Sequence, residues 1–169
     1  ADRNSKRAIR TSFRVKNNDT SVETLELSES LKNTEGKVLI FIHGLMADEV
    51  LWEEPSRGKK GYGPQISEEK NYTVLYVRYN TGRHISQNGR SISELINSLV
   101  ETYSDEIKSI TIIAHSMGGL VTRSSCHYAG VLRHTWIQKL VKIFLLGVPN
   151  DGAFLEKMGH LTTSILRNI

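Results

Sequence analysis

Four short apolar runs stand out along the chain after residue 36. They are Val38–Ile42, Val74–Val77, Ile110–Ala114 and Leu140–Leu146. Apolar runs of this length, interrupted here only by Thr111 and Lys142 and rich in β-branched residues, are typical of parallel strands that are covered on both faces. The pattern therefore predicts four covered strands of a mostly parallel sheet.

Helical patterns separate these runs. Ser91–Glu94 matches a capping box, and apolar residues follow it at helical spacing as far as Tyr103. Apolar positions also have helical spacing after the pair Gly118-Gly119, as far as Tyr128. Strands that alternate with helices favour an α/β fold, in which a mostly parallel sheet carries helices on both faces.

The first 36 residues have a different, more polar pattern. Ser12–Val15 and Val22–Leu27 alternate between polar and apolar positions on either side of a polar stretch at residues 17–20. This pattern predicts a β-hairpin. We therefore divide the chain into an N-terminal polar segment, residues 1–36, and an α/β core, residues 37–169.

A serine stands at residue 116, between the third predicted strand and the helix that follows it. A strand that turns directly into a helix strains the backbone of the residue at the turn, so the positions two before and two after it must be small. Ala114 and Gly118 meet this need. The helix N-terminus favours a developing negative charge near the serine. The pattern predicts a nucleophilic serine, and the alternative is an ordinary helix N-cap.

A second motif, His43-Gly44-Leu45, follows the first predicted strand. Together the two motifs resemble those of α/β-hydrolases of the lipase/esterase type. The form Ala-His-Ser-Met-Gly-Gly is similar to that of small bacterial lipases. The stretches at residues 79–90 and 147–153 resemble loops of bacterial lipase-like hydrolases akin to GPI-inositol deacylases. The resemblance covers residues 37 to 160.

The resemblance implies a role for each matching residue. Ser116 is the expected nucleophile, and the main-chain N–H groups of Leu45 and Met117 are the expected oxyanion hole. Two such donors stabilise a tetrahedral oxyanion by several kcal/mol. The expected substrates are carboxylic esters, often with lipid acyl groups, and neither a cofactor nor a metal is implied. The expected supporting residues around the serine are His43, Gly44, Ala114, His115 and Gly118.

The base and the acid of a catalytic triad are harder to find. In this fold they follow the serine in the order acid, then histidine. His127 lies about 16 Å along the next helix, and His134 comes after that helix. Asp151 and His160 are weak candidates within the chain. We therefore expect the triad partners and the last strands of the fold to lie beyond residue 169, and one sheet edge to be exposed and able to self-associate.

Composition adds limits to this picture. The chain has 169 residues, 38% of them hydrophobic and 24% charged, which suits one globular domain. The net charge is +4, and the run Arg57–Lys60 is expected to be a solvated loop, with a nucleic-acid patch or contact to anionic lipid as the alternatives. Of these two partners, the membrane surface is kept and no nucleic acid is expected. The single cysteine, Cys126, excludes an internal disulfide and favours the cytoplasm, while export stays open.

Two classes of function stay open. The first is a serine hydrolase that cleaves carboxylic esters, with lipid or acyl esters as the expected substrates, through an acyl-enzyme at Ser116. Acyl transfer and thioester hydrolysis use the same nucleophile. The second is a non-catalytic binding module with a hydrolase fold, which the missing base supports.

Overall fold

The computed structural model describes residues 10–15, 18–20, 22, 25–45, 52 and 61–150. The described elements are, in chain order, β1 (Ser12–Val15), β2 (Asn18–Thr20), α1 (Ser28–Asn33), β3 (Lys37–Ile42), α3 (Tyr62–Lys70), β4 (Thr73–Arg78), α4 (Ile85–Thr102), β5 (Ser109–His115), α5 (Met117–Val131), the 3-10 helix η3 (Thr135–Lys139) and β6 (Leu140–Leu146).

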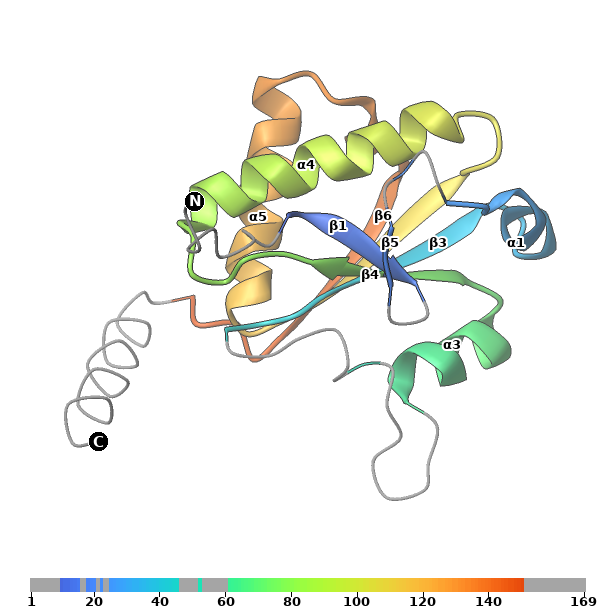
Figure 1. The fold of residues 1–169 in the computed structure, drawn as a ribbon, viewed down its shortest axis with the longest axis horizontal. Coiled ribbons are helices and arrows are strands. Elements are labelled where there is room, and N and C mark those ends of the chain that lie inside the picture. The colour runs from blue at the N-terminus through green and yellow to red at the C-terminus, as the bar shows by residue number, and fades with distance from the viewer. Residues whose placement is uncertain are drawn as a thin grey trace, which may run out of the picture.

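The strands that the structure describes form one six-stranded sheet in the order β2-β1-β4-β3-β5-β6 (Figure 1). β4, β3, β5 and β6 are parallel, as the four apolar runs predict. β1 is antiparallel to both of its neighbours, β2 and β4. Helices α4 and α5 lie on one face of the sheet and α3 on the other (Figure 1). The predicted α/β fold with a mostly parallel sheet is confirmed.

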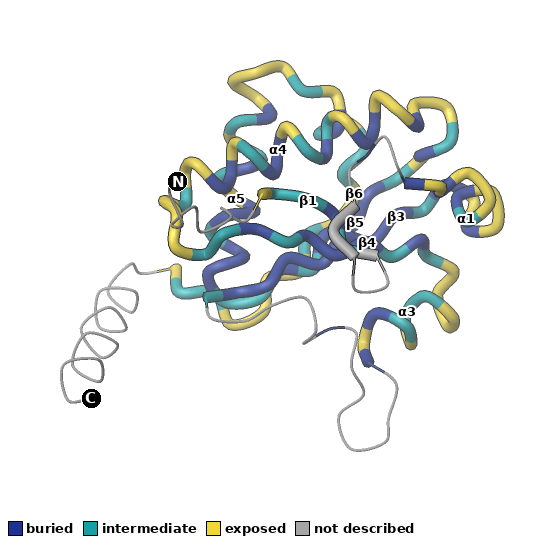
Figure 2. Tube along the Cα trace, viewed as in Figure 1, coloured by how far each residue is buried: buried dark blue, intermediate teal, exposed yellow. Residues whose placement is uncertain are grey.

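Alternate residues of the central strands fill two separate cores. On the side of α4 and α5, Ile40 and Ile42 of β3 pack in a large cluster with Ile96 and Val121. On the other side, Leu39 and Phe41 belong to a smaller cluster that Ile66 of α3 touches. This division follows from the two-residue repeat of a strand, whose successive side chains point to opposite faces. The continuous dark tube of β3 in Figure 2 shows this burial.

The N-terminal hairpin is present, but its second strand is not where the sequence predicts it. β2 is Asn18–Thr20, and Thr20 pairs with Phe13 of β1. Residues 22 and 25–27 lie outside the sheet: Leu25 donates its N–H to Val22, and Leu27 precedes α1. Val22, Leu25 and Leu27 are buried although they lie in a turn. A two-residue alternation of apolar positions does not distinguish such a turn from a strand.

The predicted capping box is also wrong. Helix α4 begins at Ile85, so Ser91–Glu94 lies inside it. Ser93 is fully buried, and its hydroxyl lies 2.9 Å from Nδ1 of His134 and accepts a hydrogen bond from Nε1 of Trp136 at 3.1 Å. Ser91, the residue that the pattern places at the cap, is thus an interior residue of α4, and Glu94 pairs with Arg90 at 3.0 Å. Ser93, the buried serine in the same stretch, binds the chain that follows α5.

β6 corrects the expectation that all four apolar runs are covered. Among the strands that the structure describes, it is the last in the sheet, and β5 is its neighbour. Val141, Phe144 and Leu146 are 65%, 48% and 44% exposed, whereas β3 is buried from Val38 to Ile42. The apolar run marks a strand in both cases, but position in the sheet decides whether it is covered.

Candidate active site

Ser116 lies at the turn that joins β5 to α5, and its backbone is strained. It has φ 53° and ψ −128°, and it is the residue immediately before the first turn of α5. A positive φ costs a residue with a Cβ about 1–3 kcal/mol at such special positions, so neighbouring contacts must hold it in place. The tight turn that the sequence pattern requires is therefore present at this serine.

Two groups of contacts hold the turn. The N–H of Ser116 donates to the carbonyl of Leu146 at 2.9 Å, and the N–H of Gly119 donates to the carbonyl of Ser116 at 3.0 Å. A Cβ on Gly118 would come within 2.4 Å of the carbonyl oxygen of His43. The first turn of α5 therefore needs glycine at residue 118, because the end of β3 lies directly against it.

The loop after β3 reaches the same place. A Cβ on Gly44 would lie 2.9 Å from the Cβ of Ser116 and 3.1 Å from the carbonyl oxygen of His115. Ala114 and Met117 are buried, and Leu45 packs against the larger core. The structure thus brings together the two sequence motifs, which lie far apart along the chain.

Tyr79 supports this loop, and the sequence analysis gave it no role of its own. Its hydroxyl donates to the carbonyl of His43 at 2.6 Å, and its ring stacks on the His43 ring with centroids 4.5 Å apart. Burial raises the pKa of the Tyr79 phenol, because the phenolate loses its hydration. The sequence held one signal for this role. Tyr79 directly follows β4 and His43 directly follows β3, and parallel neighbouring strands end at the same edge of the sheet.

His115 faces away from the side of the sheet that α4 and α5 cover. Its ring meets Trp52 at 6.3 Å with an interplanar angle of 80°. Trp52 is 5% exposed and also packs on Phe41, with ring centroids 4.8 Å apart. Nδ1 of His115 and Nε1 of Trp52 are both buried, and neither has a hydrogen-bond partner among the residues that the structure describes. His115 is therefore next to Ser116 in the sequence, but its side chain packs against Trp52 and not against the serine.

The described histidines downstream of Ser116 are placed elsewhere. His127 is exposed on α5, and its ring lies 5.5 Å from the ring of Tyr128. His134 follows the far end of α5 and bonds to Ser93. The N–H of His134 donates to the carbonyl of Ala129, thirteen residues after Ser116, so at about 1.5 Å per residue His134 lies roughly 20 Å from the serine along α5. Asp151 and His160 lie outside the described residues.

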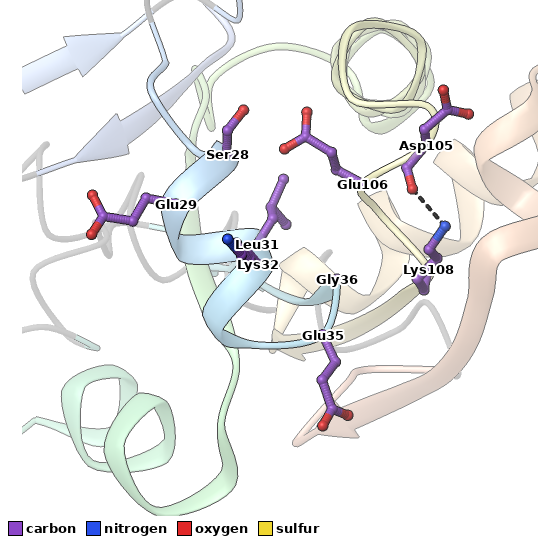
Figure 3. Close-up of a pocket in the computed structure, with 9 residues that line it drawn as sticks. All are labelled: Ser28, Glu29, Leu31, Lys32, Glu35, Gly36, Asp105, Glu106 and Lys108. Atoms are coloured by element: carbon purple, nitrogen blue, oxygen red, sulfur yellow. Dashed lines mark hydrogen bonds between the residues drawn. The ribbon is translucent and has the colours of Figure 1, made fainter.

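A hollow lined mainly by charged residues lies at the other end of the sheet (Figure 3). Its lining includes Lys32 of α1, Gly36 just before β3, and Lys108 just before β5. Ser116 follows the opposite end of β5, so this hollow is separate from the candidate site.

Across residues 10–15, 18–20, 22, 25–45, 52 and 61–150, no group of three or more His, Cys, Asp or Glu side chains is arranged to hold a metal ion. None of the helices in these stretches has the length and apolar character to cross a membrane. Cys126 is partly buried, and desolvation raises the pKa of its thiol.

Solved structures define the class of fold. The Bacillus licheniformis lipase BlEst2 matches in its propeptide form with a TM-score of 0.51 and 13% identity, over 67% of this chain and 22% of that chain. Its mature form matches with a TM-score of 0.51 and 14% identity, over 68% of this chain and 41% of that chain. The chain thus has a hydrolase-like fold and spans less than half the length of either lipase chain.

A carboxylesterase from Bacillus cereus also matches, with a TM-score of 0.43 and 18% identity, over 88% of this chain and 65% of that chain. The chain belongs to the family described as "Domain of unknown function (DUF7379)", which matches residues 6–167. No curated protein matches it.

Proposed function

We propose that this chain is a serine hydrolase that cleaves carboxylic esters through an acyl-enzyme at Ser116. One observation carries the proposal: the strained Ser116 stands at the N-terminus of α5 with Gly44 packed directly against it. An ordinary N-cap needs neither the positive φ nor the close approach of a second loop. The hydrolase-like fold shared with the BlEst2 lipase supports the same class of reaction.

The proposed reaction has two halves. Ser116 Oγ attacks the carbonyl carbon of the ester and gives up its proton, and the carbonyl oxygen becomes an oxyanion. The N–H groups of Leu45 and Met117 stabilise that oxyanion. Its collapse expels the alcohol, which takes the proton, and leaves an acyl group on Ser116. Water then attacks the acyl-enzyme, releases the carboxylic acid and restores the serine.

Two features support the assigned oxyanion donors. First-turn N–H groups of a helix have no acceptor within the helix, so the N–H of Met117 can bond to a ligand. The helix N-terminus also carries partial positive charge. Contact of Gly44 with Ser116 brings the loop that contains Leu45 to the same place.

The reaction also needs a base to take the serine proton. Because His127 and His134 are placed elsewhere, we assign the base to a residue outside the described part of the chain. His160, with Asp151 as its acid, is the candidate pair within residues 151–169.

The positions of His127 and His134, away from Ser116, also favour a second candidate function. Without a base the same fold would bind an acyl ester at Ser116 and not cleave it. In such a binding module the backbone at Ser116 would stay strained, but the Ser116 hydroxyl would not act as a nucleophile.

A fluorophosphonate, which modifies only activated serines, separates the two functions. We expect one adduct by intact-mass spectrometry on the wild-type chain and on Ser86→Ala, which removes an exposed hydroxyl from the first turn of α4. We expect none on Ser116→Ala, which should also fail to hydrolyse a p-nitrophenyl ester. An adduct that persists on Ser116→Ala contradicts the proposal. A folded wild-type chain that takes no adduct supports the binding module.

A further inference from the structure

The side chain of His43 holds the loop that carries one of the proposed oxyanion donors. His43 is 3% exposed, and its Nδ1 lies 3.0 Å from the carbonyl oxygen of Gly44. A carbonyl oxygen can only accept a hydrogen bond, so Nδ1 carries a proton and donates it. The ring of His43 therefore fixes the direction of a main-chain carbonyl in the residue that packs against Ser116.

The carbonyl of Gly44 and the N–H of Leu45 belong to the same peptide unit. This unit is planar and trans, so its C=O and its N–H point in opposite directions. A hydrogen bond that turns the Gly44 carbonyl toward the His43 ring must turn the Leu45 N–H away from that ring. The direction of the proposed donor thus depends on where the imidazole lies.

The order of the strands gives both directions. β3 lies between β4 and β5 (Figure 1). The ring of His43 stacks on Tyr79, which directly follows β4, whereas Ser116 directly follows β5. The Gly44 carbonyl is therefore turned toward the β4 side of the loop, and the Leu45 N–H toward the β5 side, where the serine stands.

The preceding peptide of the loop is held as well. The hydroxyl of Tyr79 donates to the carbonyl of His43 at 2.6 Å. Two consecutive carbonyls, those of His43 and Gly44, thus each accept a hydrogen bond from a buried side chain. A donor held in this way needs no reorganisation when negative charge develops on the substrate, which is the condition under which oxyanion donors are most effective.

We propose that His43 is a positioning residue of the oxyanion hole: its Nδ1–H holds the Gly44 carbonyl toward β4, and this aims the N–H of Leu45 at the oxyanion that forms beside Ser116. The proposal rests on the hydrolase function proposed above. It is distinct from the role of the missing base, because the ring of His43 stacks on Tyr79, on the far side of β3 from the serine.

Two replacements of nearly equal size test the hydrogen bond. Asparagine and leucine both remove the ring that stacks on Tyr79, but only the asparagine amide can donate in place of Nδ1. His43→Leu should lower kcat and kcat/KM for a p-nitrophenyl ester by about tenfold to a hundredfold, which is less than the loss of about 10²–10³ in kcat on removing a whole oxyanion donor. His43→Asn should recover most of this loss.

The Michaelis constant separates positioning from a general loss of binding. The oxyanion exists only in the transition state and the tetrahedral intermediate, so KM should stay close to the wild-type value in both variants. The end point of fluorophosphonate labelling counts the reactive serines, and kcat is expressed per labelled serine so that unfolded protein does not contribute. His127→Leu and His127→Asn are the matched controls, because His127 is exposed on α5, and both should keep the wild-type kcat.

The protonation of the ring gives a readout that needs no activity. In NMR spectra of the chain with nitrogen-15-labelled histidine, His43 should carry a proton on Nδ1 at every pH at which the chain is folded, because Nδ1 donates to Gly44. The signal that disappears in His43→Asn assigns the ring.

Three results would overturn the proposal: a wild-type kcat in His43→Leu, equal losses of kcat in His43→Leu and His43→Asn, or a neutral His43 ring whose proton is on Nε2. A wild-type chain that neither takes the fluorophosphonate nor cleaves the ester contradicts the hydrolase function instead. In that case the protonation of His43 still tests the direction of the Gly44–Leu45 peptide.

Discussion

Gly44 lies so close to Ser116 that a methyl group on it would come within 2.9 Å of the serine Cβ and 3.4 Å of its Oγ. The contact exists because β3 and β5 are parallel neighbours that end at the same edge of the sheet, with Ile42 paired to Ala114. Each strand delivers its own motif to this edge, so the pairing of the two strands assembles the candidate site.

Gly44→Ala is expected to disturb the site and the fold together. The added methyl overlaps Ser116 and the carbonyl of His115, and overpacking of this kind costs about 1–3 kcal/mol of unfolding free energy. Denaturant unfolding measures this loss, and fluorophosphonate labelling should fall with it. Gly130→Ala is the control, because nothing lies within 4 Å of its Cβ position in α5. At this position alanine should raise the unfolding free energy by about 0.5–1 kcal/mol.

Ser116→Gly is expected to be more stable than Ser116→Ala by about 1 kcal/mol, because only glycine adopts the positive φ without strain. Both variants lack the hydroxyl, so thermal unfolding isolates the backbone term. At the exposed helical position Ser98 the order should reverse, with Gly less stable than Ala by about 1 kcal/mol. Equal stability of the two Ser116 variants would mean that the turn stores no strain.

Tyr79→Phe is expected to lower the unfolding free energy by about 1–3 kcal/mol, because the buried carbonyl of His43 loses its donor. The change keeps the ring that stacks on His43. Guanidinium titration gives the loss, and Tyr62→Phe at a 65% exposed site is the control. A neutral effect at Tyr79 would mean that the loop after β3 does not rely on this bond.

Alkaline pH should act through the same phenol. Burial raises the pKa of Tyr79 in the folded chain above the ordinary value of a phenol, about 10, so the folded state holds this proton more tightly than the unfolded state. This pKa difference adds to the free energy of unfolding. The added stability is fully present below about pH 10 and is lost as the pH rises through the pKa of the folded state. Stability measured from pH 8 to 12 should fall less steeply in Tyr79→Phe than in the wild type.

Ser93→Ala is expected to cost about 1–3 kcal/mol, because Nε1 of the fully buried Trp136 then lacks its acceptor. The same change frees His134, whose Nδ1 lies 2.9 Å from the hydroxyl. Ser86→Ala, on the exposed first turn of α4, should change stability by less than about 0.5 kcal/mol. A mild effect at Ser93 would indicate that water replaces the hydroxyl.

Local patterns predicted the parts of the fold that local burial controls. The four apolar runs became β3, β4, β5 and β6, and the small residues around Ser116 mark a real turn between strand and helix. Ser91–Glu94 failed as a helix start because α4 already begins at Ile85. A serine three residues before a glutamate also occurs inside a helix, where Glu94 pairs with Arg90 one turn earlier.

The sequence by itself determined which segments are strands and where the backbone must be small, because chain stiffness and side-chain size act within a few residues. Only the tertiary structure decided the order of those strands. That order places Gly44 against Ser116, puts Tyr79 under His43, and leaves β6 at the edge with Phe144 exposed. The physical reason is that strand pairing joins residues far apart in the chain, and its choice depends on the free energy of the whole sheet.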